Sequence, residues 1–193
     1  MRVEVSEKIG EMKFKFHLDG DDKGSSTNVR MVKDSVTFQI PSDISGMVHP
    51  DLIALTSILC CHPFVGKELH LPYPVSKEFL SEARRVITRY SLIGKTNEEI
   101  TKREPPENSR PGLAFSGGVD STAALSVMPP VTVPVFLKRP KKKGSLYDYS
   151  AAIESCNLLS QIGYDVQIMI SDLEYLRDPV GFPTDLAHAA PAI

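Results

Sequence analysis

The chain reads Gly112-Leu-Ala-Phe-Ser-Gly-Gly-Val-Asp-Ser121 near its middle, a short apolar run followed by two glycines and a polar helix start. The apolar run predicts a strand over 113–115, and the glycines predict a tight turn. A helix from about 121 to 127 follows and ends before Pro129-Pro130, after which residues 131–137 predict a second strand. This order of elements is typical of α/β proteins.

The same alternation continues beyond the second strand. A helix is predicted from about 147 to 161 and a third strand over 166–170, with Gly163 suited to the position just past the helix. Three strands joined by two helices require right-handed crossovers, so we expect a parallel sheet. The inward face of the second helix comprises apolar residues, namely Tyr149, Ala152, Ile153, Cys156 and Leu159.

The first ninety residues predict a different arrangement of elements, with strands before the first helix. Alternating apolar residues predict strands over 12–18 and 36–40, separated by a turn-rich loop over 19–28. A buried helix is expected from Pro50, and a short strand over 68–71. Ser76 is the expected N-cap of a second helix, whose inward face comprises Phe79, Leu80, Ala83, Ile87 and Tyr90.

A charged, proline-rich stretch over 95–111 lacks an apolar period and is the expected linker. We therefore predict a β-rich α+β module over 1–94 and an α/β domain over 112–193. The last ten residues begin like a capped helix but end on an apolar residue, and a three-stranded parallel sheet leaves an open edge. We expect a truncated domain, or one completed by a second copy or another chain.

Composition excludes several classes of protein. The 193 residues are 41% apolar and 24% charged with a net charge of −2, which is ordinary globular composition and gives no global attraction to nucleic acid. Three cysteines, two of them adjacent, permit no disulfide framework. No apolar stretch is long enough to span a bilayer. We expect no membrane contact and a cytoplasmic location.

The glycine turn at 116–121 has the chemistry of a phosphate site. At a strand-to-helix turn, backbone N–H groups converge at the partially positive helix end, and glycines let phosphate oxygens approach. Asp120 supplies a carboxylate that can hold Mg²⁺ beside phosphates, while Ser116 and Ser121 supply hydroxyl donors. The loop lacks the lysine of a Walker A motif.

The pattern Ser116-Gly-Gly-Val-Asp-Ser121 resembles the signature of the PP-loop ATP pyrophosphatases. The order of elements over about 112–170 is similar to the layout of that superfamily, nearest to its 7-cyano-7-deazaguanine synthase and asparagine synthetase-like branch. Phe182-Pro-Thr-Asp-Leu186 is similar to the start of the next helix in that branch. The resemblance implies a parallel sheet of the HUP or Rossmann-like type. The first 110 or so residues match no family.

Members of this superfamily cleave ATP between its α and β phosphates. The resemblance therefore implies that a substrate oxygen is adenylated with loss of pyrophosphate, and that a nitrogen nucleophile, with sulfur as second choice, displaces AMP. It implies ATP and Mg²⁺ as cofactors and a small molecule or RNA as acceptor. The four-cysteine zinc site of the nearest branch and a paired cysteine for thiolation are absent.

The resemblance also assigns roles to particular residues. Ser116, Asp120 and Ser121 are the implied catalytic residues, and Asp120 is the implied metal ligand. The nucleotide is expected to contact the whole loop and the ends of the first two strands, through Ala114, Phe115, Ser116, Gly117, Gly118, Val119, Asp120, Ser121, Phe136, Leu137 and Lys138.

Other interpretations of the same residues remain open. The loop could be a plain surface turn, or the chain could be a non-catalytic ATP-binding scaffold. Ala114-Phe-Ser-Gly-Gly118 also resembles a relaxed nucleophile elbow, which would make Ser116 a hydrolase nucleophile with Asp172 or Asp185 and His188.

Two further clusters carry alternative readings. The basic run Lys138-Arg-Pro-Lys-Lys-Lys143 could grip phosphate or RNA, although a solvated loop is the commoner outcome. Cys60, Cys61 and Cys156 are expected to be core thiols, because their spacing suits no metal site.

Overall fold

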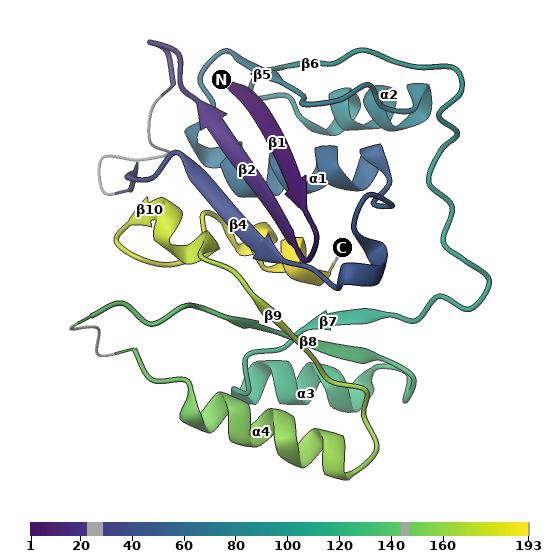
Figure 1. Ribbon diagram of the computed structural model, residues 1–193, viewed down its shortest axis with the longest axis vertical. Helices are drawn as coiled ribbons and strands as arrows, with labels where there is room; N and C mark the ends of the chain where they lie inside the picture. The colour runs from purple at the N-terminus through teal and green to yellow at the C-terminus, as the bar shows by residue number, and fades with distance from the viewer. Residues whose placement is uncertain (23–28, 144–146, 193) are drawn as a thin grey trace.

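The computed structural model describes residues 1–22, 29–143 and 147–192, which form a mixed α/β fold with two principal sheets (Figure 1). The larger sheet belongs to the first part of the chain. Its strand order is β4 (Ser35–Gln39), β2 (Glu11–His17), β1 (Arg2–Lys8), β5 (Glu68–His70) and β6 (Ser91–Ile93). β1, β2 and β4 are antiparallel neighbours, whereas β5 and β6 continue the sheet in parallel with β1.

The predicted strands over 12–18, 36–40 and 68–71 are confirmed within a residue or two. Their alternation works as expected, since Phe14 and Phe16 are buried and the residues between them are exposed. β1 and β6 were not predicted. Val3 and Val5 alternate within β1, but they are too few for the pattern to stand out from a polar segment.

Two helices accompany this sheet, α1 (Pro50–Cys61) and α2 (Lys77–Val86), with short 3₁₀ turns η1 (Ser42–Ile44) and η2 (His62–Phe64) on either side of α1. The expected N-cap is confirmed, because the Ser76 hydroxyl accepts a hydrogen bond from the Phe79 N–H at 3.1 Å. The buried carboxylate of Asp51 in turn accepts the backbone N–H and the hydroxyl of Ser76, at 2.9 and 2.7 Å. This contact joins the N-terminal ends of both helices.

The predicted second helix is too long. α2 ends at Val86, so Ile87 and Tyr90 lie beyond it rather than on its inward face. Val86, Ile87 and Thr88 are three consecutive β-branched residues, which disfavour helix, and Ile87 has extended backbone (φ −88°, ψ 99°) that leads toward β6. Tyr90 is nevertheless buried.

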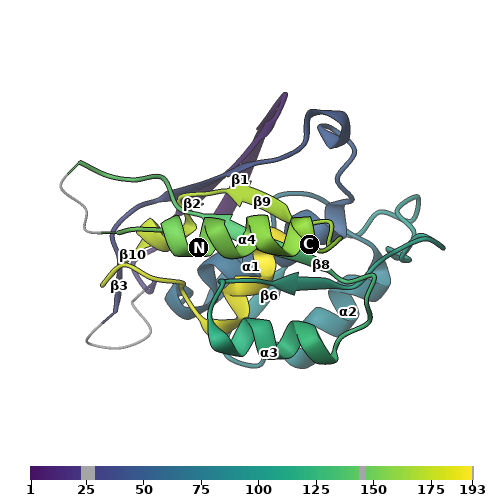
Figure 2. The ribbon, with the colours of Figure 1, turned by 90° about the horizontal axis from the view of Figure 1, so that it is seen from below.

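The second sheet is parallel, as predicted. Its order is β7 (Gly112–Ala114), β8 (Val133–Lys138) and β9 (Gln167–Ile170), connected by α3 (Val119–Val127) and α4 (Ser150–Gln161). Both helices lie on the face directed away from the first sheet (Figures 1 and 2). The predicted inward face of α4 is confirmed, since all five residues belong to the core between α4 and the sheet. The HUP-type classification stays a prediction.

The helices of the described residues are short. None of those within 1–22, 29–143 and 147–192 is long and apolar enough to cross a membrane.

The last described residues return to the first sheet. They form η3 (Leu173–Leu176), β10 (Arg177–Asp178) and the 3₁₀ helix η4 (Asp185–Ala192), where we had expected an α-helix from Thr184. β10 pairs with β3 (Arg30–Met31). Leu173, Leu176, Ala187 and Ala190 are buried in the N-terminal core, and η4 contacts α1, β7 and β8. Residues after the expected linker therefore pack against residues before it. The division into domains over 1–94 and 112–193 stays a prediction.

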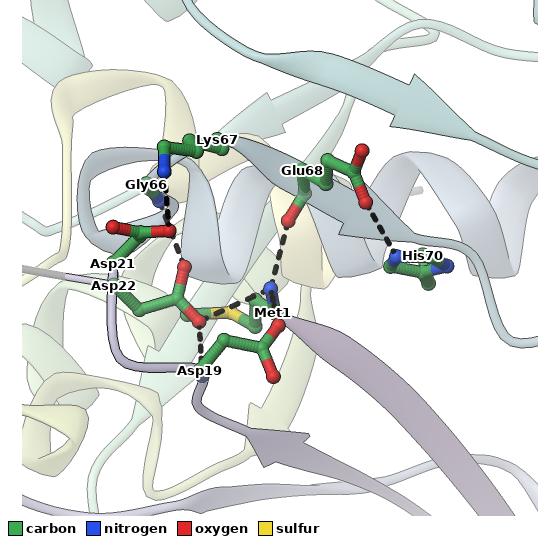
Figure 3. A network of polar contacts seen from close by, with 8 residues as sticks. All are labelled: Met1, Asp19, Asp21, Asp22, Gly66, Lys67, Glu68 and His70. Carbon is green, nitrogen blue, oxygen red and sulfur yellow. Dashed lines mark hydrogen bonds and ion pairs between the residues drawn. The ribbon is translucent and has the colours of Figure 1, made fainter.

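The amino group of Met1 lies in a network of polar contacts that ties the start of β1 to β5 (Figure 3). It contacts the carboxylates of Asp19 and Asp22, at 2.7 and 3.1 Å, and donates to the Glu68 carbonyl at 2.8 Å. The Asp22 carboxylate is buried and also accepts the Gly66 N–H at 2.8 Å. One cation thus joins three segments of the chain.

We expect the free energy of unfolding to fall as the pH rises from about 7 to about 9. Burial lowers the pKa of the Met1 amino group, but its bonds to Asp19 and Asp22 raise it more, so its folded pKa lies above the usual value of about 8. The protonated amine therefore stabilises the fold below pH 8, and this contribution is lost as the pH passes its folded pKa. Urea unfolding across this range measures the slope.

Asp19→Asn is the informative variant, because it removes a charge from the amine without touching Asp22. Its stability should be lower at pH 7 and should depend less on pH than that of the wild type. Asp21→Asn is the matched control, since Asp21 pairs with Lys67 at 2.8 Å and not with the amine. Identical slopes for wild type and Asp19→Asn would contradict this account.

Candidate functional site

The segment between β7 and α3 closes on itself through two serines. The hydroxyls of Ser116 and Ser121 lie 3.1 Å apart, and the Ser121 hydroxyl donates to the Gly118 carbonyl at 3.0 Å. The Gly118 N–H donates to the Ser116 hydroxyl at 3.3 Å. A plain turn requires none of these side chains, whereas here they fix the curvature of the loop where α3 begins.

Gly117 is the residue that this curvature requires. Its φ of +77° lies in the left-handed region, which side chains with a Cβ rarely adopt. A Cβ at this position would also lie 3.0 Å from the Cα of Ala152, so the loop packs directly on α4. The glycine pair thus sets both the backbone conformation of the loop and its distance from the next helix.

The N-terminal end of α3 is open. Gly118 is the N-cap, and no side chain among the described residues caps the first turn, so none of them partners the N–H groups of Val119, Asp120 and Ser121. Asp120 and Val119 are exposed. Within the described part of the chain, the Asp120 carboxylate makes no hydrogen bond or ion pair. The loop therefore presents donors, a free carboxylate and a partial positive charge to solvent.

A cavity of about 270 Å³ lies at the ends of β7 and β8, beside this loop. Of the residues predicted to contact nucleotide, five line it: Ala114, Phe115, Ser116, Phe136 and Leu137. The other predicted residues, Gly117, Gly118, Val119, Asp120, Ser121 and Lys138, do not line it. Ser116 is thus the residue at which the cavity and the loop meet.

Sequence reasoning missed the opposite wall of the cavity. That wall comes from the start of α4 and from the C-terminal segment, with Tyr147, Asp148, Tyr149, Ala152, Glu174, Phe182, His188 and Pro191. The rings of Phe182 and His188 meet edge to face with centroids 3.8 Å apart. The aromatic residues flanking Asp148 were a usable signal. The hydrolase interpretation had considered His188 with Ser116, but no local pattern indicated that residues 182–191 as a whole fold back to this place.

Asp148 is the ionised acceptor in that wall. Its carboxylate accepts the Ser150 N–H at 2.9 Å, and this bond lowers the pKa of the carboxyl below its usual range. Glu174 differs, because it forms an ion pair with Arg139 at 2.6 Å. The cavity therefore contains two carboxylates, of which Glu174 is held in an ion pair and Asp148 accepts a backbone N–H.

The basic run is divided in the structure. Arg139 is largely buried: it pairs with Glu174, and its guanidinium lies 3.8 Å from the centre of the Tyr147 ring. Lys142 and Lys138 lie over the rings of Tyr175 and Tyr149, at 3.7 and 4.8 Å. Lys141 and Lys143 are exposed. Arg139 is thus part of the structure rather than a free phosphate ligand.

The serine hydrolase arrangement is incomplete. Ser116 and His188 line the same cavity, but the hydrogen bonds of the Ser116 hydroxyl go to Ser121 and Gly118. The Asp172 carboxylate accepts the Thr37 N–H at 2.8 Å and pairs with Lys33. Across the described ranges, no hydrogen bond joins serine, histidine and aspartate into a relay.

The three cysteines are buried, as predicted. Burial raises the pKa of each of the thiols of Cys60, Cys61 and Cys156, which keeps them protonated and unreactive. Among the residues that the structure describes, no group of three or more His, Cys, Asp or Glu residues is arranged to hold a metal ion.

No protein-family model matches this chain, and neither the curated proteins nor the solved structures contain a match to it.

Gly117→Ala should destabilise the fold more than Gly163→Ala. Both glycines have positive φ, which costs a residue with a Cβ about 1–2 kcal/mol, but only Gly117 would also press a methyl group against Ala152. Gly163 has open space around it, so it isolates the backbone cost. Urea unfolding of the two variants compares them, and equal losses would contradict a tight contact between the loop and α4.

Proposed function

We propose that this chain binds ATP with Mg²⁺ at the loop 116–121 and cleaves the bond between the α and β phosphates to adenylate an acceptor. The observation that carries the proposal is the loop itself. A serine-braced glycine turn ends in an uncapped helix and stands beside a nucleoside-sized cavity at the ends of parallel strands. Ligands of open α/β sheets bind at this edge.

The loop residues would hold the pyrophosphate portion of ATP. Backbone N–H groups at the start of α3 would donate to phosphate oxygens, and the hydroxyls of Ser116 and Ser121 can turn from each other toward the same anion. Asp120 fits Mg²⁺, because its carboxylate is exposed and has no partner among the described residues, and this ion takes one or two protein carboxylates together with phosphates. When bound, Mg²⁺ supplies charge neutralisation for the leaving pyrophosphate.

The cavity would hold the adenosine portion. Phe115 and Phe136 are buried aromatic residues at its base, and Tyr149 lies on the opposite wall. A purine ring is favoured between such rings by stacking and by burial of apolar area. The ionised Asp148 can accept hydrogen bonds from the exocyclic amino group of adenine.

The proposed reaction has two steps. An oxygen of the acceptor attacks the α phosphorus, a new P–O bond forms, and the bond to the bridging oxygen breaks with its electron pair leaving on pyrophosphate. A nitrogen nucleophile then attacks the adenylated centre, loses its proton, and displaces AMP. The residues of this chain position the phosphates and stabilise the negative charge that develops on them.

The acceptor would be a small molecule or an RNA. A non-catalytic ATP-binding module is the second candidate, and a specific observation favours it. Asp120 is the one acidic residue of the loop 116–121, so the loop offers phosphate binding before it offers a general base. Measuring binding and pyrophosphate release separately distinguishes the two.

Asp120→Ala should weaken binding of ATP with Mg²⁺ by about tenfold or more, because it removes the carboxylate that holds the ion. Calorimetric titration measures the affinity, with AMP and pyrophosphate as separate ligands. Pyrophosphate binding should weaken in the variant, whereas AMP binding should be retained.

Asp43→Ala is the matched control, since Asp43 is an exposed aspartate at a distant 3₁₀ turn. It should bind ATP like the wild type. Absence of ATP binding by the wild type would contradict the proposal. Binding without pyrophosphate release, over a panel of carboxylate and RNA acceptors, would favour the non-catalytic module.

A further inference from the structure

The N-terminal module contains a second cavity, unrelated to the phosphate loop. It measures about 570 Å³, against about 270 Å³ for the cavity beside Ser116. It lies between α1, α2 and the C-terminal segment, and we call it the α1–α2 groove. It is lined by residues of α1, of α2 and the segment that follows it, and of the C-terminal segment. A volume of several hundred Å³ is typical of sites for small organic ligands.

The walls of the groove are aliphatic along most of its length. Leu55 and Leu59 come from α1, and Ala83 faces them from α2. At the rim, Val86 and Leu186 are 69% and 68% exposed. Two large apolar side chains are therefore exposed to solvent at the edge of an apolar cavity. From Leu55 to His62 the helix rise gives the groove a length of about 10 Å. These dimensions suit a single alkyl chain.

One end of the groove carries a fixed positive charge. Arg89 donates to the carbonyls of His62 and Pro63, at 3.3 and 3.0 Å, which holds its guanidinium at the C-terminal end of α1. These bonds use two of its five donors. The remaining N–H groups are available to a ligand, because Arg89 is exposed and forms no ion pair among the residues described.

The other titratable groups of the groove leave that charge unopposed. Glu82 is paired with Arg85, whose Nη2 lies 2.8 Å from its carboxylate. The Nδ1 of His62 lies 3.0 Å from the Tyr90 hydroxyl, and burial, with a smaller effect of Arg89, lowers the pKa of His62 below its usual value. His62 is therefore neutral at pH 7, and the polar end of the groove bears the single charge of Arg89.

We propose that the α1–α2 groove binds an alkyl monocarboxylate, with its carboxylate on Arg89 and its alkyl chain between α1 and α2. The complementarity is specific in both parts. A guanidinium binds a carboxylate through two parallel hydrogen bonds, and the aliphatic walls favour a chain without polar groups. Each buried methylene contributes about 0.8 kcal/mol of transfer free energy. The proposal does not rest on ATP binding, and each site is tested with its own ligand, so the two proposals stand or fall separately.

The test is calorimetric titration of decanoate, used below its micelle concentration, into the full chain at pH 7. Decanol and decyltrimethylammonium are matched neutral and cationic probes. Decanoate should bind, decanol should bind about tenfold or more weakly, and the cation should not bind. Equal affinity for decanoate and decanol would overturn the assignment of the carboxylate to Arg89.

Two variants address the two ends of the site. Arg89→Gln should weaken decanoate binding by about tenfold or more while leaving decanol binding unchanged. Ala83→Phe should block both ligands by filling the groove. Lys77→Gln is the control, because Lys77 is an exposed cation on α2 that does not line the groove, whereas Arg85 is left in place as the partner of Glu82. Thermal unfolding and ATP titration of each variant separate loss of the site from loss of the fold.

Sedimentation at several protein concentrations tests the competing occupant. If the chain self-associates without ligand and Ala83→Phe abolishes the association, the groove belongs to a second copy and the proposal is overturned. Absence of decanoate binding by a monomeric wild type also overturns it.

Discussion

A parallel sheet with both of its helices on one face has to cover the other face, and most of this structure depends on how that requirement is met. β7, β8 and β9 carry α3 and α4 on the same side (Figure 1). The bare side is covered by the N-terminal module, against whose core Leu137 and Met169 pack. Hydrophobic burial is the dominant favourable term in folding, so the two halves stabilise each other.

Polar contacts fix the register of that packing. Asp172 lies two residues beyond the end of β9, and its carboxylate accepts the Thr37 N–H of β4 while pairing with Lys33. Beyond it, Leu173 and Leu176 are fully buried in the N-terminal core. The ends of the parallel strands are therefore held at a defined place, which is also the place where Ser116 and the cavity lie.

Local signals in the sequence were sufficient for most elements. The alternation of Phe14 and Phe16 identified a strand, Ser76 identified a helix start, and the apolar spacing of α4 identified its buried face. They were insufficient where tertiary contacts decide. α2 stops at Val86, where three β-branched residues begin and the chain turns to add β6 to the sheet, whereas the apolar spacing alone predicted a longer helix.

The candidate site divides in the same way. The loop 116–121 was found because its chemistry is encoded in six consecutive residues. The strand ends Phe115 and Phe136 followed from the resemblance and do line the cavity. The place of Phe182 could not be predicted, because it depends on a return of the chain from far along the sequence, and His188 was considered beside Ser116 only in the hydrolase interpretation. The sequence shows Arg139 only as one cation of a basic run, because its partners Glu174 and Tyr147 are separated from it along the chain.

The return of residues 182–191 has one more consequence. Phe182 and His188 form part of the cavity beside the phosphate loop, whereas Thr184 and Leu186 form part of the α1–α2 groove. Residues 182–191 therefore line both the cavity beside the phosphate loop and the α1–α2 groove. A displacement of this segment changes the shape of both cavities. If a ligand in one cavity alters the affinity of the other through it, linkage requires the reverse effect to have the same size. The segment that closes the architecture thus contributes side chains to two pockets that are otherwise built from different parts of the chain.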